Sequence, residues 1–312
     1  MQGPFKTYCI IGDPIDHSLS PAMHNAAFNS VGLNSIYIAF RVPKGELEVS
    51  LHSLRATKIS GFNVTIPHKV DIIPYIDELD PSAKLAKAVN TVHQIGGSFK
   101  GYNTDVQGFI EPLHKRSISM NGMKILLIGS GGAARAIVAA LSNEIGISLI
   151  IVANRTKKNA DELISMASDL GLRADFTSME NIGEHALKSD LIINSTPNGL
   201  NDEQSILDYD HISKDSIVYD IVYRPMVTNL IEQAKYAKAT VIYGYEMLLA
   251  QGARAFEIWT GINAPLEAMK KALLGHFDEP PDPVDGSDRA SQGRWRPGRG
   301  RGPTPRSRTA PR

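Results

Sequence analysis

The sequence predicts an α/β protein of two domains, and three observations support that fold class. The chain has 312 residues, which is long for one ordinary domain and comfortable for two. Short apolar runs of strand length alternate with helix-like stretches, and the alternation starts again after residue 122. Hydrophobic residues make up 42% of the chain and charged residues 21%, which is enough apolar material for a globular core.

The first series of strands and helices covers residues 1–105, where we expect the first domain. Its predicted strands are the runs YCIIG, SIYIAF, GFNVTI and NTVHQIG, and stretches such as PAMHNAAFNSVG predict helices between them, in a βαβ rhythm. Ser20 and Pro21 are typical of a helix start, with Ser20 as the N-cap and Pro21 as the first helical residue. Residues 106–122 predict a connecting helix that ends at Asn121-Gly122.

The second series lies within residues 106–243, where we expect the second domain. Its predicted strands are MKILLIG, SLIIVAN, DLIINST, SIVYDIV and ATVIYG, with amphipathic helices between them. Strands that alternate with helices in this way predict a parallel sheet. Residues 244–277 predict two helices broken near Gly261 to Pro265, which we expect to fold back onto the first domain.

Beyond residue 277 the sequence consists mainly of Pro, Gly, Arg and Ser, so we expect residues 278–312 to be a disordered tail. The tail holds eight Arg and five acidic residues, which leaves 25 basic and 28 acidic residues in the rest of a chain whose net charge is zero. An RNA-binding or localisation arm is one interpretation of the tail, and a disordered appendage is the other. We favour the appendage and expect no nucleic-acid partner, because nothing before the tail looks like a nucleic-acid module.

Cysteine use and the N-terminus restrict the compartment. Cys9 is the only cysteine, which excludes an internal disulfide and a CxxC redox or metal motif. This usage is typical of a reducing compartment, so we expect a cytoplasmic protein. The first residues lack a basic start followed by a long apolar run, and no stretch of about 18 apolar residues occurs, so we expect neither a signal peptide nor a membrane span.

A strand, a glycine turn and a helix start follow one another from Lys124 to Ala136. The segment fits the fingerprint G-x-G-x-x-G/A, with Gly129 for the tight turn, Gly131 for close approach of the backbone to a pyrophosphate, and Ala134 for close helix–strand packing. Free N–H groups at a helix start also attract an anion. The spacing therefore predicts a dinucleotide site, whose expected contacts are Gly129, Ser130, Gly131, Gly132 and Ala133.

The end of the next strand predicts which dinucleotide binds. NAD-binding folds place Asp or Glu there to hold the ribose 2′-OH, whereas this chain has the stretch ANRTKK. Arg155 can pair with a 2′-phosphate and stack on adenine, and Asn154 and Thr156 can donate hydrogen bonds. Lys157 or Lys158 adds positive charge, and a basic helix start is unfavourable unless an anion binds there. The stretch therefore predicts NADP(H).

Polar residues gather in three clusters of the first domain. Ser18 and Ser20 share the loop HSLSP, where capping alone is one interpretation of Ser20 and a pair of hydroxyls facing a ligand carboxylate is the other. In GFNVTIPHK, Asn63 and Thr65 alternate with apolar residues and so share one face of a strand. Lys69 follows just beyond the end of that strand, where an exposed lysine at a helix start is the plainer interpretation.

The third cluster combines the segments AVNT and GYNTD, which contain Asn90 and Asp105. Each segment alone could be a turn former. Together the three clusters supply hydroxyls, amides, one cation and one carboxylate, but no set of metal ligands. That combination suits a small polyhydroxylated acid, and we expect no metal.

Taken together, these motifs resemble those of the shikimate dehydrogenase family over roughly residues 7–275. The matching motifs, in the family's order, are HSLSPAMHN, GFNVTIPHK, AVNT, GYNTD, GSGGAARA, NRT, NSTPNG, YDIVYRPMVTNL and GYEMLLAQGARAFEIWTG. The resemblance implies a substrate-binding and catalytic domain over residues 1–105 and a Rossmann-type NADP-binding domain over 106–243. The implied reaction is the reversible, NADPH-dependent reduction of 3-dehydroshikimate to shikimate, in the pathway to chorismate and the aromatic amino acids. The resemblance also allows a homodimer.

The resemblance implies roles for single residues. Lys69 and Asp105 are the implied catalytic pair. The implied substrate-binding residues are Ser18 and Ser20 for the carboxylate and Asn63, Thr65, Asn90 and Gln251 for ring hydroxyls, with Tyr223 nearby. The residues implied to line the nicotinamide side are Thr196, Val222, Gly244 and Met247. The family usually has Gly before AVNT, and Lys87 stands there in this chain, so we expect a changed backbone at that turn with Asn90 still in register.

In the expected mechanism, Lys69 stabilises the negative charge that grows on the ketone oxygen and delivers a proton, while Asp105 holds Lys69 and a substrate hydroxyl. Two alternatives stay open. A quinate/shikimate dehydrogenase with NAD or mixed cofactor use is the nearer one, and the basic stretch NRTKK argues against it. A ligand-sensing regulatory protein without catalysis is the other, and the presence of both Lys69 and Asp105 argues against it.

Overall fold

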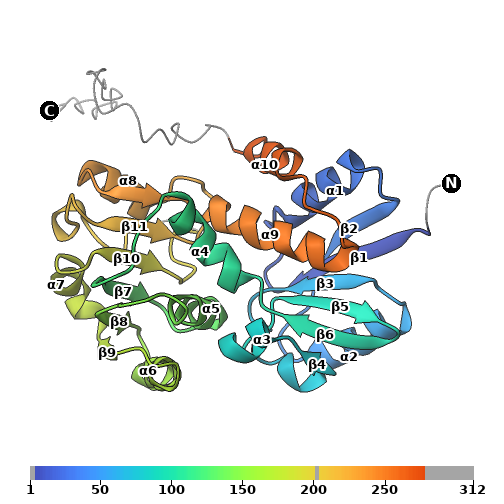
Figure 1. Cartoon of the computed structure of the whole chain (residues 1–312), viewed down its shortest axis with the longest axis horizontal. Helices are drawn as coiled ribbons and strands as arrows, with labels where there is room; N and C mark the ends of the chain where they lie inside the picture. Colours follow the sequence, from blue (N-terminus) through green and yellow to red (C-terminus); the bar gives the residue numbers. More distant parts are fainter. Residues whose placement is uncertain (1–3, 201–203, 278–312) are drawn as a thin grey trace, which may run out of the picture. The chain divides into compact units, whose positions relative to one another are not determined.

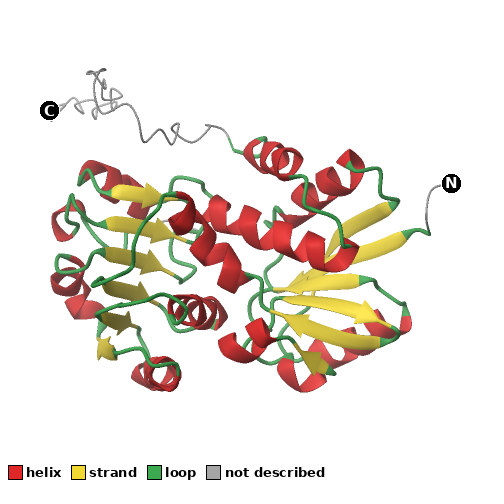
Figure 2. Cartoon of the chain, viewed as in Figure 1, coloured by secondary structure: helices red, strands yellow, loops and turns green. Residues whose placement is uncertain are grey.

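The structure is a computed structural model, and it describes residues 4–200 and 204–277. These residues form two six-stranded sheets with helices packed on them (Figures 1 and 2). The predicted two-domain α/β class is therefore confirmed. The prediction for residues 278–312 lies outside the described residues. Within the described part of the chain, no helix combines the length and the apolar character needed to cross a bilayer.

The first sheet has the strand order β2-β1-β3-β5-β6-β4. Its strands are β1 (Lys6–Gly12), β2 (Ser35–Arg41), β3 (Gly61–Val64), β4 (Glu78–Leu79), β5 (Thr91–Ile95) and β6 (Ser98–Tyr102). The connections between β1, β2 and β3 are α1 (Ser20–Ser30) and α2 (Leu47–Ala56), and β1 is parallel to both of its neighbours. The expected βαβ rhythm stops there, because β5 runs antiparallel to β3 and to β6.

The first sheet is therefore mixed, and the reason is a hairpin. The strands β5 and β6 are joined by Gly96-Gly97, whose φ angles are 59° and 89°. Two adjacent residues with positive φ form the turn whose twist matches that of a hairpin. The strand β6 was not among the predicted strands, although a Gly-Gly pair between two strand-length runs is a hairpin signal.

The second sheet has the strand order β12-β11-β10-β7-β8-β9, and all five of its pairings are parallel. Its strands are β7 (Lys124–Ile128), β8 (Leu149–Ala153), β9 (Ala174–Thr177), β10 (Leu191–Asn194), β11 (Ile217–Asp220) and β12 (Thr240–Ile242), of which β9 was not expected. The helices that follow them include α5 (Gly132–Leu141), α6 (Lys157–Asp169), α7 (Ile182–Ala186) and α8 (Asn229–Tyr236). From β7 the strand order continues outward through β8 to β9, and from β10 it continues outward on the other side. The switch point of the strand order therefore lies between β7 and β10, which is where open α/β sheets bind ligands.

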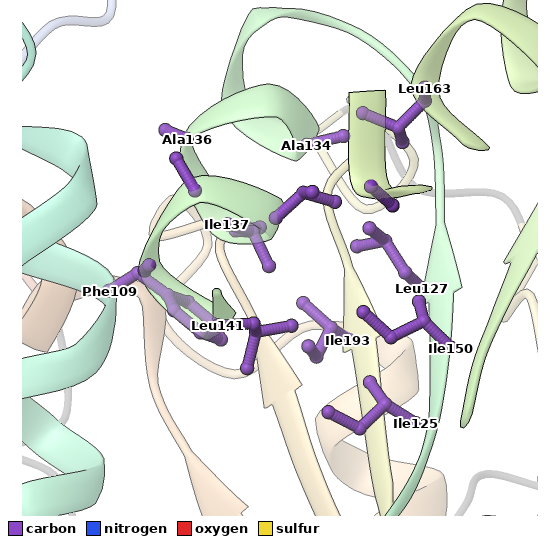
Figure 3. Packing of buried hydrophobic residues seen from close by; sticks show 14 of the residues in the cluster. Phe109, Ile125, Leu127, Ala134, Ala136, Ile137, Leu141, Ile150, Leu163 and Ile193 are labelled. Atoms are coloured by element: carbon purple, nitrogen blue, oxygen red, sulfur yellow. The ribbon is translucent and has the colours of Figure 1, made fainter. Parts of the chain in front are cut away.

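The helix α5 is held against the second sheet by small and branched side chains (Figure 3). Ala134, Ile137 and Leu141 lie on its buried face, in one cluster with Leu127 and Ile193 of the strands. Because Ala134 is small, the start of α5 can approach the sheet closely, as the third position of the glycine fingerprint requires. This packing fixes the first turn of α5 next to the end of β7.

Two helices connect the parts of the fold that carry the sheets. The helix α4 (Asp105–Lys115) leads from the first sheet to the second, and α9 (Gly244–Thr260) packs against it on the way back. Arg116 and Glu246 join them through two hydrogen bonds of 2.9 and 3.0 Å. The helix α10 (Leu266–Leu274) then packs on α1, as expected for helices that return to the first domain.

The connecting helix is shorter than predicted. It ends at Lys115 rather than at Asn121-Gly122, because Ser117 adopts a left-handed backbone with φ 54°. The N–H of Ile118 then donates to the carbonyl of Leu113 (3.1 Å). Helices that end in a left-handed glycine are closed by the same kind of hydrogen bond. No glycine stands at this position, so the sequence carries no stop signal there.

The start of α1 also differs from the prediction. Leu19 is the N-cap, without a side-chain cap, and Ser20 and Pro21 are the first two helical residues, so Ser20 is wrong as an N-cap. Its side chain is buried next to that of Tyr37 instead. The strand expected over GFNVTI ends at Val64, and Pro67, which has no N–H to donate to a neighbouring strand, lies in the turn that follows.

Candidate functional site

The site is built around Lys69 and Asp105, which come from different segments. Lys69 lies in a turn after β3, where its carbonyl accepts a hydrogen bond from Val89 N (2.7 Å). Asp105 is the first residue of α4, a position where the helix dipole favours a carboxylate. The ammonium nitrogen of Lys69 lies 2.7 Å from Oδ2 of Asp105, and the two side chains are only 15% and 7% exposed. The pair is therefore a largely buried, charge-assisted hydrogen bond.

Asn90 holds the other side of the Asp105 carboxylate. Its amide nitrogen donates to Oδ1 of Asp105 (2.8 Å) and to the hydroxyl of Thr104 (3.0 Å). Its carbonyl oxygen accepts from the backbone N–H of Thr104 (2.7 Å). An amide group has two N–H donors, and both are engaged here. Asn90 therefore fixes the orientation of Asp105.

Asn63 belongs to a buried network that the sequence motifs indicate only in part. Its amide nitrogen donates to the carbonyl of Asn90 (3.1 Å) and to the hydroxyl of Thr91 (2.9 Å), and its carbonyl oxygen accepts from the hydroxyl of Tyr37 (2.6 Å). The hydroxyl of Thr91 donates in turn to Oδ1 of Asn90 (3.0 Å). An unbroken series of side-chain hydrogen bonds thus runs from Tyr37 to Asp105 and on to Lys69.

Three members of this network were not predicted as site residues: Tyr37, Thr91 and Thr104. The two threonines belong to the motifs AVNT and GYNTD, so their spacing was a usable signal. Tyr37 belongs to an apolar strand, where an aromatic residue predicts only core packing. Its hydroxyl nevertheless belongs to the polar network. The backbone N–H and carbonyl of Tyr37 both form hydrogen bonds with the side-chain amide of Asn25 (2.8 Å each).

Gln251 reaches the network from α9. Its carbonyl oxygen lies 3.4 Å from the amide nitrogen of Asn90, and its own amide nitrogen donates to the carbonyl of Leu248 (2.9 Å). Gly108 on α4 makes this approach possible, because a β-carbon built there would lie 2.7 Å from Cβ of Gln251. The close packing of α4 and α9 thus sets the position of Gln251.

The residues predicted to bind a carboxylate lie in the loop before α1 and at its start. The hydroxyl of Ser18 accepts from the backbone N–H of Ser20 (3.3 Å). Tyr223 lies next to the side chain of Ser18, and burial of its ring raises the pKa of its hydroxyl. Thr65 follows β3 directly, and its methyl group occupies the space beside Gly12. The hydroxyl of Tyr223 therefore joins the serine pair that was expected to face a carboxylate.

Lys87 occupies the position before AVNT where the resemblance led us to expect glycine. It ends α3 (Pro81–Ala86) with φ 47°, in the left-handed region that glycine favours. The lysine thus accepts a glycine-like backbone, and Asn90 keeps its place three residues later. The ammonium of Lys87 lies 3.2 Å from Asp169 at the end of α6, with both side chains more than half exposed.

The glycine turn has the shape that a dinucleotide needs. Gly129 has φ 108°, and a β-carbon there would collide with Ser195 and Thr196. Around Gly131 nothing lies within 4 Å of a built β-carbon, so the backbone faces open space. Gly131 is also the N-cap of α5 and offers no side chain to the first N–H groups. The turn therefore leaves room and donors for a pyrophosphate.

The stretch after β8 carries positive charge without a carboxylate at the strand end. Asn154 donates its amide to the carbonyl of Thr156 (2.9 Å), which shapes the turn. Arg155 and Lys158 are exposed, and Lys158 lines a surface pocket together with Arg135 of α5 and the acidic residues Asp161 and Glu162. Lys157 is paired with Asp161 (2.7 Å) and is less available. This arrangement fits an anion such as a 2′-phosphate better than a free ribose hydroxyl.

The four residues expected on the nicotinamide side lie at or after the carboxyl ends of the second sheet. Thr196 follows β10, and its hydroxyl donates to the side chain of Asn194 (2.7 Å). Val222 follows β11, and Gly244 packs so closely on the backbone carbonyl of Val222 that its own β-carbon would collide there. Met247 is buried one turn into α9. Their strands end at the same edge of the sheet as β7, which leads into the glycine turn.

Three family models, all of shikimate dehydrogenases, match successive parts of the chain. A model described as the shikimate dehydrogenase substrate binding domain matches residues 10–92. A shikimate / quinate 5-dehydrogenase model matches residues 112–221, and a shikimate 5'-dehydrogenase C-terminal domain matches residues 244–274. A relative from Nitrosopumilus maritimus, named shikimate dehydrogenase (NADP(+)), is 50% identical over 272 residues, which is 87% of this chain and 99% of the relative.

Solved structures give the same result. Shikimate 5-dehydrogenase from Thermus thermophilus, in complex with NADP(H) and shikimate, has a TM-score of 0.76 at 36% identity, over 86% of this chain and 98% of the other. Quinate dehydrogenase from Corynebacterium glutamicum, in complex with NAD, has a TM-score of 0.79 at 26% identity, over 87% of this chain and the whole of the other. Both enzymes are therefore similar to this chain over nearly all of the described residues.

Proposed function

The chain belongs to the shikimate dehydrogenase family, and on that premise we propose that Lys69 and Asp105 are its catalytic pair. The activity is that of an NADP-dependent oxidoreductase acting on a CH–OH group: the reversible reduction of 3-dehydroshikimate to shikimate in the shikimate pathway. The observation that carries the proposal for the pair is their 2.7 Å hydrogen bond in a largely buried position.

The chemistry is divided between the cofactor and this pair. When bound, NADPH supplies the hydride. As the ketone becomes an alkoxide, the ammonium of Lys69 stabilises the negative charge on the oxygen and donates a proton to it. Asp105 takes one N–H of that ammonium, which leaves two for the substrate. The same carboxylate can accept a hydrogen bond from a neighbouring substrate hydroxyl.

The rest of the polar network is proposed to bind and orient the acid. Ser18 and Ser20, with the hydroxyl of Tyr223, would donate to the substrate carboxylate. Asn63 has both N–H groups engaged, so it would accept from a ring hydroxyl through the remaining lone pair of its carbonyl oxygen. The remaining proposed hydroxyl contacts are Thr65, Asn90 and Gln251.

The cofactor is proposed to lie along the turn at the start of α5. The backbone from Gly129 to Ala133 would hold the pyrophosphate, and Arg155 would hold the 2′-phosphate with help from Asn154, Thr156 and Lys158. The residues proposed to line the nicotinamide side are Thr196, Val222, Gly244 and Met247. The open space at Gly131 and the absence of a carboxylate over residues 154–156 support this arrangement.

The proposal also assigns a role to each part of the chain. Residues 1–105 would bind the acid, residues 106–243 would bind NADP(H), and residues 244–277 would carry Gln251 back to the first part. The spans of the three family models support these boundaries. A homodimer and a cytoplasmic location are proposed as well, the latter because NADPH is an intracellular reductant.

The direct test is oxidation of NADPH by the purified full-length chain with 3-dehydroshikimate, followed by the loss of nicotinamide absorbance. We expect turnover that saturates in both substrates, and the reverse reaction with shikimate and NADP+. The absence of turnover in both directions by folded protein would reject the assigned activity.

A second candidate is oxidation of quinate with NAD, which the similarity to the quinate dehydrogenase from Corynebacterium glutamicum favours. The basic, carboxylate-free end of β8 argues against NAD as the preferred cofactor. Values of kcat/KM for shikimate and quinate, each with NADP+ and NAD+, separate the two candidates. A higher value for quinate with NAD+ would favour the second.

A further inference from the structure

The hydrocarbon stem of Lys69 lies directly against Gly132 at the start of α5. A β-carbon built on Gly132 would lie 2.9 Å from Cβ of Lys69 and 3.2 Å from its Cδ. Carbon atoms in packed proteins keep about 3.5–4.0 Å apart, so a side chain at this position has no room. The Cβ atom of Lys69 is bonded to the backbone and cannot swing away as the end of the side chain could.

The backbone of Gly132 does not itself require glycine. Gly132 is the first residue of α5 and is not among the glycines with positive φ, whereas Gly129 in the same turn has φ 108°. Alanine would favour the helix by up to about 1 kcal/mol relative to glycine. The contact with Lys69 is therefore the feature of this structure that explains the missing side chain.

Gly131, one residue earlier, has the opposite surroundings. A β-carbon built there meets no atom within 4 Å, and this open side is where the pyrophosphate is proposed to lie. The two neighbouring glycines thus face different things: Gly131 faces open space, and Gly132 faces Lys69.

We infer that Gly132 is a positioning residue, which seats the stem of Lys69 so that the cofactor-binding turn determines where the ammonium group lies. Lys69 then has three anchors: its carbonyl accepts from Val89, its stem packs on Gly132, and its ammonium donates to Asp105. This inference rests on the proposed role of Lys69 in catalysis. It makes the first turn of α5 a shared support, because that turn is proposed to hold the cofactor as well.

The matched variants Gly132→Ala and Gly131→Ala test it. Gly132→Ala moves Lys69, so kcat at saturating substrates should fall by about 10-fold or more, since misplacement of about 1 Å can cost 10²-fold. The pH profile of kcat should change as well. The Kd for NADPH, read from its fluorescence, should stay within about threefold, because Gly132 is proposed to contact the pyrophosphate only through its backbone, while the added methyl group points at Lys69. Gly131→Ala should weaken NADPH binding instead and leave the shape of the pH profile of kcat in place.

Two outcomes overturn the inference. One is a Gly132→Ala variant with the unmodified kcat and pH profile. The other is a Gly132→Ala variant that loses NADPH affinity as Gly131→Ala does, with an unchanged pH profile, which would make Gly132 a cofactor contact alone. If the unmodified chain does not turn over 3-dehydroshikimate at all, the proposed function fails, and that result is distinct from both.

A stability measurement keeps the test independent of activity. If Gly132→Ala lowers the melting temperature or does not fold, the same change in a Lys69→Gly background should be tolerated, because the opposing β-carbon is then gone. Failure of Lys69→Gly to relieve the effect of Gly132→Ala would overturn the contact as its cause.

Discussion

The ammonium nitrogen of Lys69 lies 2.7 Å from Oδ2 of Asp105, although the two residues are 36 positions apart in the chain. The second oxygen of the same carboxylate accepts from Asn90 at 2.8 Å. Both oxygens of Asp105 are thus held, and the ammonium is aimed by a carboxylate that cannot rotate freely. Such pre-organised charge is what stabilises an alkoxide as it forms.

Removal of either partner should therefore reduce turnover strongly and change cofactor affinity much less. We expect Lys69→Met and Asp105→Asn each to lower kcat by about 10²-fold or more, and the double variant to lose little beyond the worse single one, because the two groups act as a unit. Steady-state kinetics with 3-dehydroshikimate and NADPH measure this. Exposed Lys84→Met is the control. Near-normal turnover in Lys69→Met would remove Lys69 from the catalytic role.

Cofactor choice should depend on Arg155. Arg155→Asp places a carboxylate where NAD-binding folds hold the ribose hydroxyls, so it should repel a 2′-phosphate. We expect kcat/KM for NADPH to fall by about 10²-fold, with the value for NADH unchanged or raised, since a charged hydrogen bond contributes about 1.5–3 kcal/mol. The same substitution at exposed Arg173 is the control. An unaltered ratio of the two values would show that Arg155 does not contact the phosphate.

Substrate affinity should depend on Gly108, which touches no proposed ligand. A β-carbon there would lie 2.7 Å from Cβ of Gln251 and 3.0 Å from its backbone nitrogen. Gly108→Ala should therefore displace Gln251, raise KM for 3-dehydroshikimate several-fold and lower the free energy of unfolding by about 1–3 kcal/mol, as overpacking does. NADPH affinity should not change. Gly275→Ala, where the built β-carbon keeps 3.4 Å, is the matched control.

Lys87 should be a site where stability can be gained. Its left-handed backbone costs a lysine roughly 1–2 kcal/mol, whereas glycine adopts it freely and loses about 0.5–1 kcal/mol in chain entropy. The ion pair with Asp169 is more than half exposed on both sides and contributes little. We expect Lys87→Gly to raise the free energy of unfolding in urea by up to about 1 kcal/mol. Asp169→Asn isolates the ion pair, and a loss of stability in both variants would contradict the strain argument.

Much of the fold was predictable because local signals and tertiary structure agree. Five of the six strands of the second sheet and the turn from Gly129 to Ala134 follow from apolar runs and glycine spacing, and they lie as expected. The end of α4 was not predictable, since Ser117 adopts a conformation that the sequence marks only when a glycine is present. The strand β9 has the sequence ADFT with only its last residue buried, so its apolar pattern is weak.

The site divides in the same way. The motifs that contain Lys69, Asn90 and Asp105 could be recognised from residue type, but the partners of each side chain depend on how distant segments meet. Tyr37 shows the limit, because its ring belongs to the core while its hydroxyl binds Asn63. A strand pattern predicts the first property and carries no information about the second.

The buried His24 should make the free energy of unfolding depend on pH. Its ring is fully buried on α1 and stacks on Tyr37 with 4.5 Å between the ring centres. Both ring nitrogens lack a hydrogen-bond partner in the described structure, and burial lowers the pKa of the imidazole to about 3. The unfolded chain, in which histidine titrates near its usual pKa of about 6.5, therefore binds a proton that the folded chain excludes.

The free energy of unfolding should consequently fall as the pH drops from about 6.5 towards 3, by about 1.4 kcal/mol per pH unit from this residue. His24→Phe keeps an aromatic ring against Tyr37 and removes the titration. Between pH 7.5 and pH 5, urea unfolding of the unmodified chain should therefore lose about 2 kcal/mol more than that of His24→Phe. Exposed His52→Phe is the control, and it should keep the full loss. Equal losses in the unmodified chain and in His24→Phe would mean that His24 takes up its proton without unfolding.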